Sequence, residues 1–295
     1  VDIDPETLSV DPAELERRVR ETKPRAFVFV HLFGSRADLT AIREICDRYD
    51  VMLIEDCAQS YVGYVDTLQG DVAMYSFGTI KTATAMGGAI FVFRHWEIQR
   101  AVESAASKLT AQSRWAFAKK LVKSSAFLAL GHRAVFGLFS RIVRDHDATI
   151  RKLSRGFSGD EWLKKIRHAP SIPLLALLAR RFENYNPESI WRRRASGEFA
   201  REVLPIVGAR ARRRTHWLLA VTPDDANEFV KNARRLGYDA TQGTSVLCAL
   251  GGPIAEALMR DIVYVPCYDG LERADFERLA TLTTSPRRDR QNAAA

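Results

Sequence analysis

The chain has 295 residues, of which 46% are hydrophobic and 27% charged, a composition typical of a folded globular protein with a substantial core. Its net charge of +8 suits phosphates, acidic membrane lipids and nucleic acid alike, so charge alone excludes none of these ligands. No uncharged apolar run reaches the ~18 residues that a membrane span needs. No signal peptide opens the sequence, and we therefore expect a cytoplasmic protein.

The four cysteines occur singly, without a CxxC motif and without a histidine at metal-ligand spacing: Cys46, Cys57, Cys248 and Cys267. This pattern predicts small buried hydrophobic residues in a reducing compartment, and neither a disulfide framework nor a metal site. The sequence opens at Val1 instead of a methionine, in what reads as the edge of a folded unit. We expect either an unusual start codon or a longer protein.

The first hundred residues alternate strand and helix patterns. Short apolar runs predict strands at residues 26–33, 51–54, 71–77 and 89–94. Gly34 closes the first strand, and residues 38–49 carry apolar side chains at helical spacing, with Asp38 as the expected N-cap. Strand, helix and strand within about thirty residues form a βαβ unit, which predicts a parallel sheet with a right-handed crossover.

The middle of the chain, from residue 96 to about 166, is helical and basic. Within it, residues 115–142 combine an apolar stripe with basic flanks. This segment predicts an amphipathic helix or helix pair that packs on the core or on a second subunit; docking on an anionic membrane is the alternative. Further helices are predicted at residues 174–182, 188–203, 224–236 and 273–282, and strands at 217–221 and 262–265.

These patterns together predict an α/β fold with a mainly parallel sheet and flanking helices, a helical insertion and a small α+β C-terminal domain. The predicted domain division is residues 1–95, 96–170 and 171–284, followed by a polar, basic tail at 285–295 that we expect to be disordered.

Ligands of a parallel α/β sheet bind beyond the carboxyl ends of its strands. Here the predicted strand ends carry His31 and Gly34, then Asp56 and Gln59, then the run from Ser76 to Lys81. A carboxylate, an amide, a hydroxyl and a lysine amine are thereby brought to one neighbourhood. Such a set suits a cofactor that has a ring nitrogen, a phenolic oxygen, a phosphate and an aldehyde.

Three segments, VHLFG, IEDCAQS and SFGTIKTATAMGGAI, resemble in order and spacing the motifs of DegT/StrS-type sugar aminotransferases of the fold type I pyridoxal-phosphate superfamily. The resemblance covers about residues 1–93 and, more weakly, VYVPCYDGLERADFERL near the C-terminus. The family's N-terminal segment, which holds the cofactor phosphate at a helix start, has no counterpart in the sequence. The resemblance therefore implies an incomplete large domain and a chain that binds pyridoxal 5'-phosphate weakly.

Residue by residue, the resemblance implies that Lys81 is the catalytic lysine, whose amine condenses with the cofactor aldehyde and later moves a proton. Asp56 would pair with the pyridine nitrogen, Gln59 would bond near the ring oxygen and Ser76 would bind the phosphate. For Asp56 a helix N-cap remains an alternative, with Glu55 as the important acid. We expect His31 and His216 to be packed structural histidines.

The implied function is transfer of an amino group from an amino acid such as glutamate to a nucleotide-linked keto sugar, in a homodimer. Related dehydratases have a histidine at the lysine position, so Lys81 favours transamination. The alternative is a truncated, non-catalytic member of the fold that binds a partner or, less favoured, a membrane surface. The arginines at 192–194 and 210–214 have little aromatic interleaving, so we expect no nucleic-acid partner.

Overall fold

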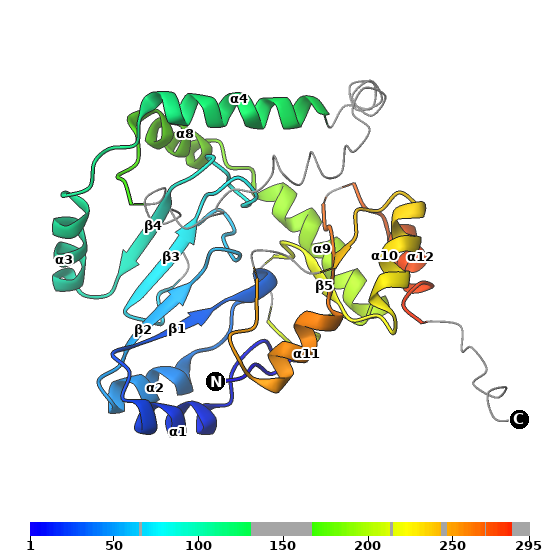
Figure 1. Cartoon of the computed structure of the whole chain (residues 1–295), viewed down its shortest axis with the longest axis horizontal. Helices are drawn as coiled ribbons and strands as arrows, with labels where there is room; N and C mark the ends of the chain where they lie inside the picture. The colour runs from blue at the N-terminus through cyan, green and yellow to red at the C-terminus, as the bar shows by residue number, and fades with distance from the viewer. Residues whose placement is uncertain (65–66, 131–166, 213–214, 243–246, 269, 285–295) are drawn as a thin grey trace, which may run out of the picture. The chain divides into compact units, whose positions relative to one another are not determined.

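The computed structural model describes residues 1–64, 67–130, 167–212, 215–242, 247–268 and 270–284 (Figure 1). The chain forms two compact units. The first comprises the described residues of Val1–Ser76, Ile90–Arg94 and Tyr185–Ala295, and the second those of Phe77–Ala89 and His95–Asn184. The domain division predicted from the sequence stays a prediction.

A four-stranded sheet contains β1 (Ala26–Val30), β2 (Met52–Asp56), β3 (Val72–Ser76) and β4 (Ala89–Phe93), side by side in that order (Figure 1). The first three strands run parallel to one another. The Arg94 amide donates to the Asp71 carbonyl and the Phe77 amide to the Gly88 carbonyl, so β4 runs antiparallel to β3. The expected α/β fold with a mainly parallel sheet is confirmed.

Two helices, α1 (Pro12–Thr22) and α2 (Thr40–Arg48), cover one face of this sheet (Figure 1). The Asp11 side chain caps α1 by accepting from the Ala13 amide, and Pro12 stands in its first turn. Apolar side chains of both helices and of β1 and β2 form a common core: Leu15, Val19, Phe29, Leu39, Ile42, Ile45, Cys46, Val51 and Leu53. The sequence patterns predicted α2 but not α1.

The opposite side of the sheet is partly exposed to solvent. Val28, Val30 and Phe91 have 53%, 38% and 50% of their surface exposed. Because side chains alternate along a strand and register partners point the same way, Asp56 lies on this side beside Val30. We call this side the open face; it includes Val28, Val30, Ile54, Asp56, Val72, Met74, Ser76 and Phe91.

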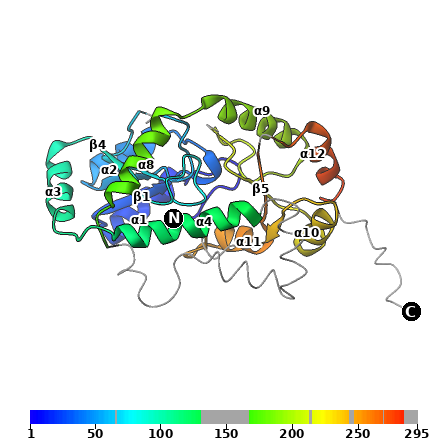
Figure 2. The same ribbon diagram turned by 90° about the horizontal axis from the view of Figure 1, so that it is seen from above.

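The C-terminal part of the first unit is a small α+β arrangement. Its antiparallel sheet has the order β5 (Leu219–Val221), β7 (Val263–Val265) and β6 (Thr241–Gln242). Around β5 lie α9 (Pro187–Val203), α10 (Ala226–Arg235) and α12 (Arg273–Ala280), as Figure 2 shows. Gly237, with φ of +91°, follows the end of α10.

The start of the chain is tied to α11 (Pro253–Asp261). The Asp2 carboxylate accepts hydrogen bonds from the amides of Ile254 (2.8 Å) and Ala255 (3.0 Å). It thereby satisfies two amides that lack partners within the helix, and its charge suits the positive end of the helix dipole. Gly252 stands at the N-cap with φ of +99°, and a Cβ there would lie 2.6 Å from Asp2 Cγ.

The second unit contains α3 (Trp96–Ala106), α4 (Arg114–Leu130) and α8 (Ile172–Glu183), and α4 packs against α8. Trp115, Val122 and Leu128 on α4 are 79%, 71% and 79% exposed. The predicted amphipathic segment 115–142 is thus helical as far as residue 130, and the remainder lies outside the described residues. None of the described helices combines the length and apolar character needed to cross a membrane.

Three local predictions were wrong in detail. The strand predicted to reach Phe33 ends at Val30, because Phe33 adopts φ of +53° within the short 3-10 helix η1 (Leu32–Gly34). Asp38 bonds the Thr40 amide at 3.0 Å, but α2 begins only at Thr40. Cys248 is exposed, whereas the other three cysteines are buried as expected. The tail 285–295, with Arg213 and Arg214, lies outside the described residues.

Candidate active site

Asp56 is the last residue of β2 and lies half-buried on the open face. One of its carboxylate oxygens, Oδ1, accepts from the Ala58 amide at 2.9 Å. The bond fixes the side chain against the turn that follows the strand and leaves Oδ2 as the oxygen that could meet a ligand. No helix begins after Asp56 in the described residues up to β3, so the helix N-cap alternative is wrong; the carboxylate stabilises a turn at the carboxyl end of the sheet.

Gln59 stands in the turn after β2, and its side-chain oxygen accepts from the Phe33 amide at 2.7 Å. This contact joins the segment after β2 to the segment after β1 and supports the left-handed backbone at Phe33. The side-chain amide nitrogen of Gln59 is then the group that could donate to a ligand.

Ser76 ends β3, the strand next to β2, and its side chain is half-buried on the open face. The structure thus brings Asp56, Gln59 and Ser76 to the carboxyl edge of two adjacent parallel strands, as predicted. All three belong to the first compact unit. Their side chains offer a carboxylate acceptor that suits the ring nitrogen of pyridoxal phosphate, an amide donor that suits its ring oxygen and one hydroxyl that suits its phosphate.

Lys81 lies in the second unit, in a loop that runs from Phe77 to the glycine pair Gly87 and Gly88 and that we call the lysine loop. The amides of Ala85 and Gly87 both donate to the Phe77 carbonyl at 3.0 Å, which closes the base of the loop. Gly88, with φ of +83°, would carry a Cβ only 3.0 Å from Leu174. The loop therefore requires glycine there, and Lys81 stands half-buried within a well-anchored segment.

A second lysine contacts the same loop. Lys120, on α4, is half-buried, and its Nζ lies 3.5 Å from the position that a Cβ on Gly87 would take. Burial lowers the pKa of this amine. The sequence patterns placed Lys120 among the basic residues of the middle section and gave no sign that it reaches the lysine loop.

Glu55, the neighbour of Asp56, points to the other face and is fully buried. Its Oε2 lies 2.7 Å from Arg36 Nη1 and 3.0 Å from His31 Nε2, and its Oε1 accepts from the Gln69 and Gly70 amides at 2.7 and 2.6 Å. All of its acceptor capacity is therefore used within the protein. These contacts make Glu55 a structural acid and favour Asp56 as the residue that faces a ligand.

The charge states in this cluster follow from burial and partners. Burial lowers the pKa of His31 below 6.5, reinforced by the charge of Arg36, so the imidazole is neutral. Burial alone would raise the pKa of Glu55, but hydrogen bonds from His31 and Gly70 together with Arg36 hold it below its usual value. Burial also raises the pKa of Cys57 to about 11, which keeps its thiol protonated.

The side chains of His31, Glu55 and Cys57 lie close enough together to suggest a metal site, which the sequence patterns did not predict. The positive charge of Arg36 disfavours a metal cation at this position. Its Nη1 lies 2.8 Å from His31 Nε2, 2.7 Å from Glu55 Oε2 and 2.9 Å from Cys57 Sγ. A guanidinium thus takes the place that a metal ion would need.

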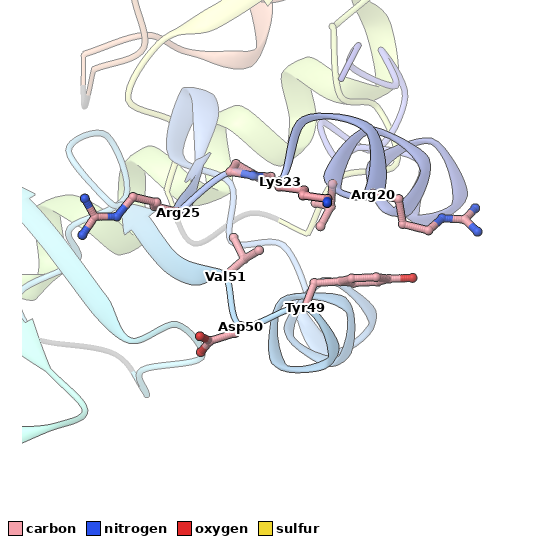
Figure 3. Close-up of a pocket in the computed structure, with 8 residues that line it drawn as sticks. Arg20, Lys23, Arg25, Tyr49, Asp50 and Val51 are labelled. Carbon is pink, nitrogen blue, oxygen red and sulfur yellow. The ribbon is translucent and has the colours of Figure 1, made fainter.

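A pocket of about 500 Å³ lies at the amino-terminal ends of β1 and β2, between the ends of α1 and α2. Figure 3 shows Arg20 and Arg25 at its rim pointing in opposite directions, so they do not converge on one ligand. The carboxyl ends of both helices, the negative ends of their dipoles, also face this region and disfavour an anion. The carboxyl edge of the sheet remains the better site.

Comparison with known proteins agrees with the motifs at that edge. Residues 1–123 match the model of the DegT/DnrJ/EryC1/StrS aminotransferase family. The match covers the first 123 of the 295 residues. An L-glutamine:2-deoxy-scyllo-inosose aminotransferase from Streptoalloteichus tenebrarius is 39% identical over 111 residues, which are 35% of this chain and 25% of the relative. The chain therefore aligns with about a quarter of that relative's length.

Solved structures extend the likeness in fold beyond the family segment. The aminotransferase TlmJ from Streptoalloteichus hindustanus aligns with a TM-score of 0.60 over 95% of this chain and 70% of its own, at 19% identity. An E. coli GDP-4-keto-6-deoxy-D-mannose-3-dehydratase with bound hydrated pyridoxal phosphate aligns with a TM-score of 0.64 over 96% and 73%, at 14% identity. The fold that this chain shares with these structures therefore extends into its C-terminal third. The roles of Lys81, Asp56, Gln59 and Ser76 stay predictions.

Proposed function

We propose that this protein is a pyridoxal-phosphate-dependent aminotransferase that moves an amino group from an amino acid to a keto sugar or a closely related cyclic ketone. The observation that carries the proposal is the placement of Asp56 on the open face, with Gln59 and Ser76 at the same edge. Lys81 follows five residues after Ser76, in the SFGTIK motif of the family segment.

In this proposal each residue has one task. Asp56 keeps the pyridine nitrogen protonated, so that the ring can accept electrons from the substrate carbon when the cofactor is bound. The Gln59 amide donates near the ring oxygen, and Ser76 donates to the phosphate. The Lys81 amine holds the cofactor and moves a proton to and from the reacting carbon. Gln59 also positions the backbone at Phe33 through its oxygen.

The substrates are proposed from the relatives. The inosose aminotransferase is named for L-glutamine as donor and a cyclic ketone as acceptor, and the dehydratase for a GDP-linked keto sugar. We favour a nucleotide-linked keto sugar as acceptor and glutamine or glutamate as donor, in a homodimer. Supplying each donor with each acceptor class in turn, and following formation of the amino product by mass spectrometry, separates these choices.

The decisive experiment for the proposed function maps the lysine. Borohydride reduction of protein loaded with pyridoxal phosphate, followed by peptide mapping, is expected to find the pyridoxyl group on Lys81. Lys120 is the informative rival, because it contacts the same loop and burial lowers its pKa. A label on Lys120 that survives in Lys81→Arg and is lost in Lys120→Arg contradicts the assignment.

Asp56→Asn is expected to lower turnover by roughly two to three and a half orders of magnitude, since breaking a buried charge pair costs ~3–5 kcal/mol. Glu55 faces the other side of the sheet, so we expect Glu55→Gln to lower turnover less than Asp56→Asn does, although it leaves the Arg36 charge without its carboxylate partner. Steady-state kinetics of both variants at matched cofactor occupancy test the difference. A reversed order would show that Glu55 is the ligand-facing acid.

The alternative is a non-catalytic chain that keeps the fold. Absorbance distinguishes the two, because an aminotransferase that holds its cofactor on a lysine is yellow, and addition of the amino donor bleaches the band. Protein that stays colourless at saturating pyridoxal phosphate would favour the non-catalytic alternative.

A further inference from the structure

Arg36 holds both sequence neighbours of Asp56. Its Nη1 lies 2.7 Å from Glu55 Oε2 and 2.9 Å from Cys57 Sγ, while its Nη2 donates to the Thr67 carbonyl at 2.9 Å. Glu55 and Cys57 are fully buried, and Arg36 is 5% exposed. The Arg36 guanidinium thus contacts the residues before and after Asp56 at the end of β2. Arg36 itself lies in the loop that follows β1, the neighbouring strand.

The backbone of Asp56 is held from the same loop. The His31 amide donates to the Asp56 carbonyl at 2.9 Å, and the His31 side chain contacts Glu55 at 3.0 Å. The Cys57 amide donates to the Met74 carbonyl of β3 at 2.8 Å. The two backbone bonds fix the peptide group that links Asp56 to Cys57, next to the Asp56 side chain, which itself points to the open face.

The Arg36–Glu55 ion pair is weak as a source of stability. The desolvation of two charges commonly cancels their attraction, so apolar residues could replace a buried pair at little cost in stability. The planar guanidinium of an arginine also has a geometric effect. Its N–H donors point in fixed directions and hold several partners at fixed angles to one another, which a lysine amine cannot do. The arrangement is therefore better explained by the geometry that it imposes on β2.

We propose that Arg36 is a positioning residue for the aminotransferase reaction, which fixes the end of β2 so that the Asp56 carboxylate is held toward the cofactor ring nitrogen. This role rests on the proposed function. Catalytic groups must be held to within about 0.5 Å by the residues behind them. Arg36 acts from the face of the sheet opposite Asp56 and touches no ligand itself.

The first measurement needs no cofactor. In Arg36→Lys, amide hydrogen exchange at His31 and Cys57 is expected to be at least tenfold faster than in the wild type, because the guanidinium that holds the strand end is lost. Arg43→Lys is the matched control. Arg43 pairs with Asp71 at 2.8 Å, and Asp71 accepts from the Leu53 amide near the other end of β2. This variant should leave the exchange of His31 and Cys57 unchanged.

The second measurement uses a double-mutant cycle with Asp56→Asn. If Arg36 acts through Asp56, Arg36→Lys lowers kcat tenfold or more in the wild-type background and less than twofold in Asp56→Asn. The KM for the amino donor should change little in either background. Arg36→Met combined with Glu55→Gln removes both charges, keeps a folded core free of an unpaired ion, and should show the same dependence on Asp56.

Equal losses of kcat in both backgrounds, or unchanged amide exchange, would overturn the role of Arg36 while leaving the proposed function intact. Wild-type protein that shows neither the yellow band nor amino transfer would overturn the proposed function and this role with it. Faster exchange together with an unchanged kcat would reduce Arg36 to a structural residue.

Discussion

His31 and Glu55 are buried titratable groups in direct contact, and the pKa of each lies below its usual value. The unfolded histidine therefore binds a proton near pH 6.5 that the folded one does not, and the same holds for Glu55 near pH 4.5. Both shifts contribute stability that is fully present above these values and is lost as the pH falls through them. The cluster makes the first unit sensitive to acid.

We therefore expect the free energy of unfolding to fall as the pH drops below 6.5, with a slope of at most about 1.4 kcal/mol per pH unit for each proton. His31→Gln should be less stable than the wild type at pH 7, yet lose less stability between pH 6.5 and 5. Urea denaturation across this range provides the measurement. If the free energy of unfolding falls equally with pH in the two proteins, a group other than His31 titrates. Arg36 and Cys57, which lie beside His31, keep their protons across this pH range.

The sequence indicates that β2 ends near Glu55 and Asp56, but it does not indicate which of the two acids faces which side of the sheet. Leu53 and Ile54 are both apolar, so the alternation that would assign Glu55 to one face and Asp56 to the other cannot be read from MLIED. The packing of α1 and α2 on one side of the sheet decides it. The contact of Gln59 with Phe33 joins residues 26 apart and follows only from the turn at Phe33.

Among the helices, α9 contains a glycine that helix propensity alone would disfavour. Gly197 lies in the interior of α9, where an alanine would ordinarily be better by about 1 kcal/mol. A Cβ at this position would lie 2.1 Å from Cγ of the His216 ring, which is fully buried and contacts Glu198 at 3.2 Å. The glycine allows α9 to pass this ring closely.

Gly197→Ala is therefore expected to lower the free energy of unfolding despite its better propensity, because overpacking a filled core costs about 1–3 kcal/mol. Ala195→Gly, on the exposed side of the same helix, provides a control that should cost about 1 kcal/mol through propensity alone. Thermal and urea unfolding compare the two. A stabilised Gly197→Ala would mean that the His216 ring moves aside freely.

At the level of elements, prediction succeeded for the strands of the first sheet and failed for the helices α1 and α11. All four strands of the first sheet were predicted, because each is a compact apolar run. The helix α1 was missed, since PAELERRVRET buries only Leu15 and Val19 and resembles a solvated segment. Its stability comes instead from the Asp11 cap and from packing on α2, neither of which shows in the apolar pattern.

For the whole molecule, the open face raises the question of self-association. β1 stands at one end of the strand order, and it carries the exposed Val28 and Val30. An edge strand offers unpaired backbone groups, and exposed apolar side chains beside them favour pairing with another chain. The described part of the molecule therefore combines two features that promote association.

Val28→Lys is expected to reduce concentration-dependent association, because a charge on an edge strand opposes edge-to-edge pairing. Val102→Lys on α3 is the matched control: it makes the same substitution at a valine that is 41% exposed but lies on a helix. Sedimentation velocity over a range of concentrations measures both. An equal decrease in the two variants would reflect added net charge and not the edge of β1.

The bond between Asp2 and the start of α11 also sets an order of events during synthesis. Asp2 and Ile254 are 252 residues apart, and ribosomes add about 5–20 residues per second. The partner amides are therefore synthesised roughly 13 to 50 s after the Asp2 carboxylate. The carbonyls of Pro5 and Glu6 obtain their partners, the amides of Gly208 and Arg210, earlier than Asp2 obtains the amide of Ile254. Asp2 can thus reach this native contact only after 252 further residues have been added.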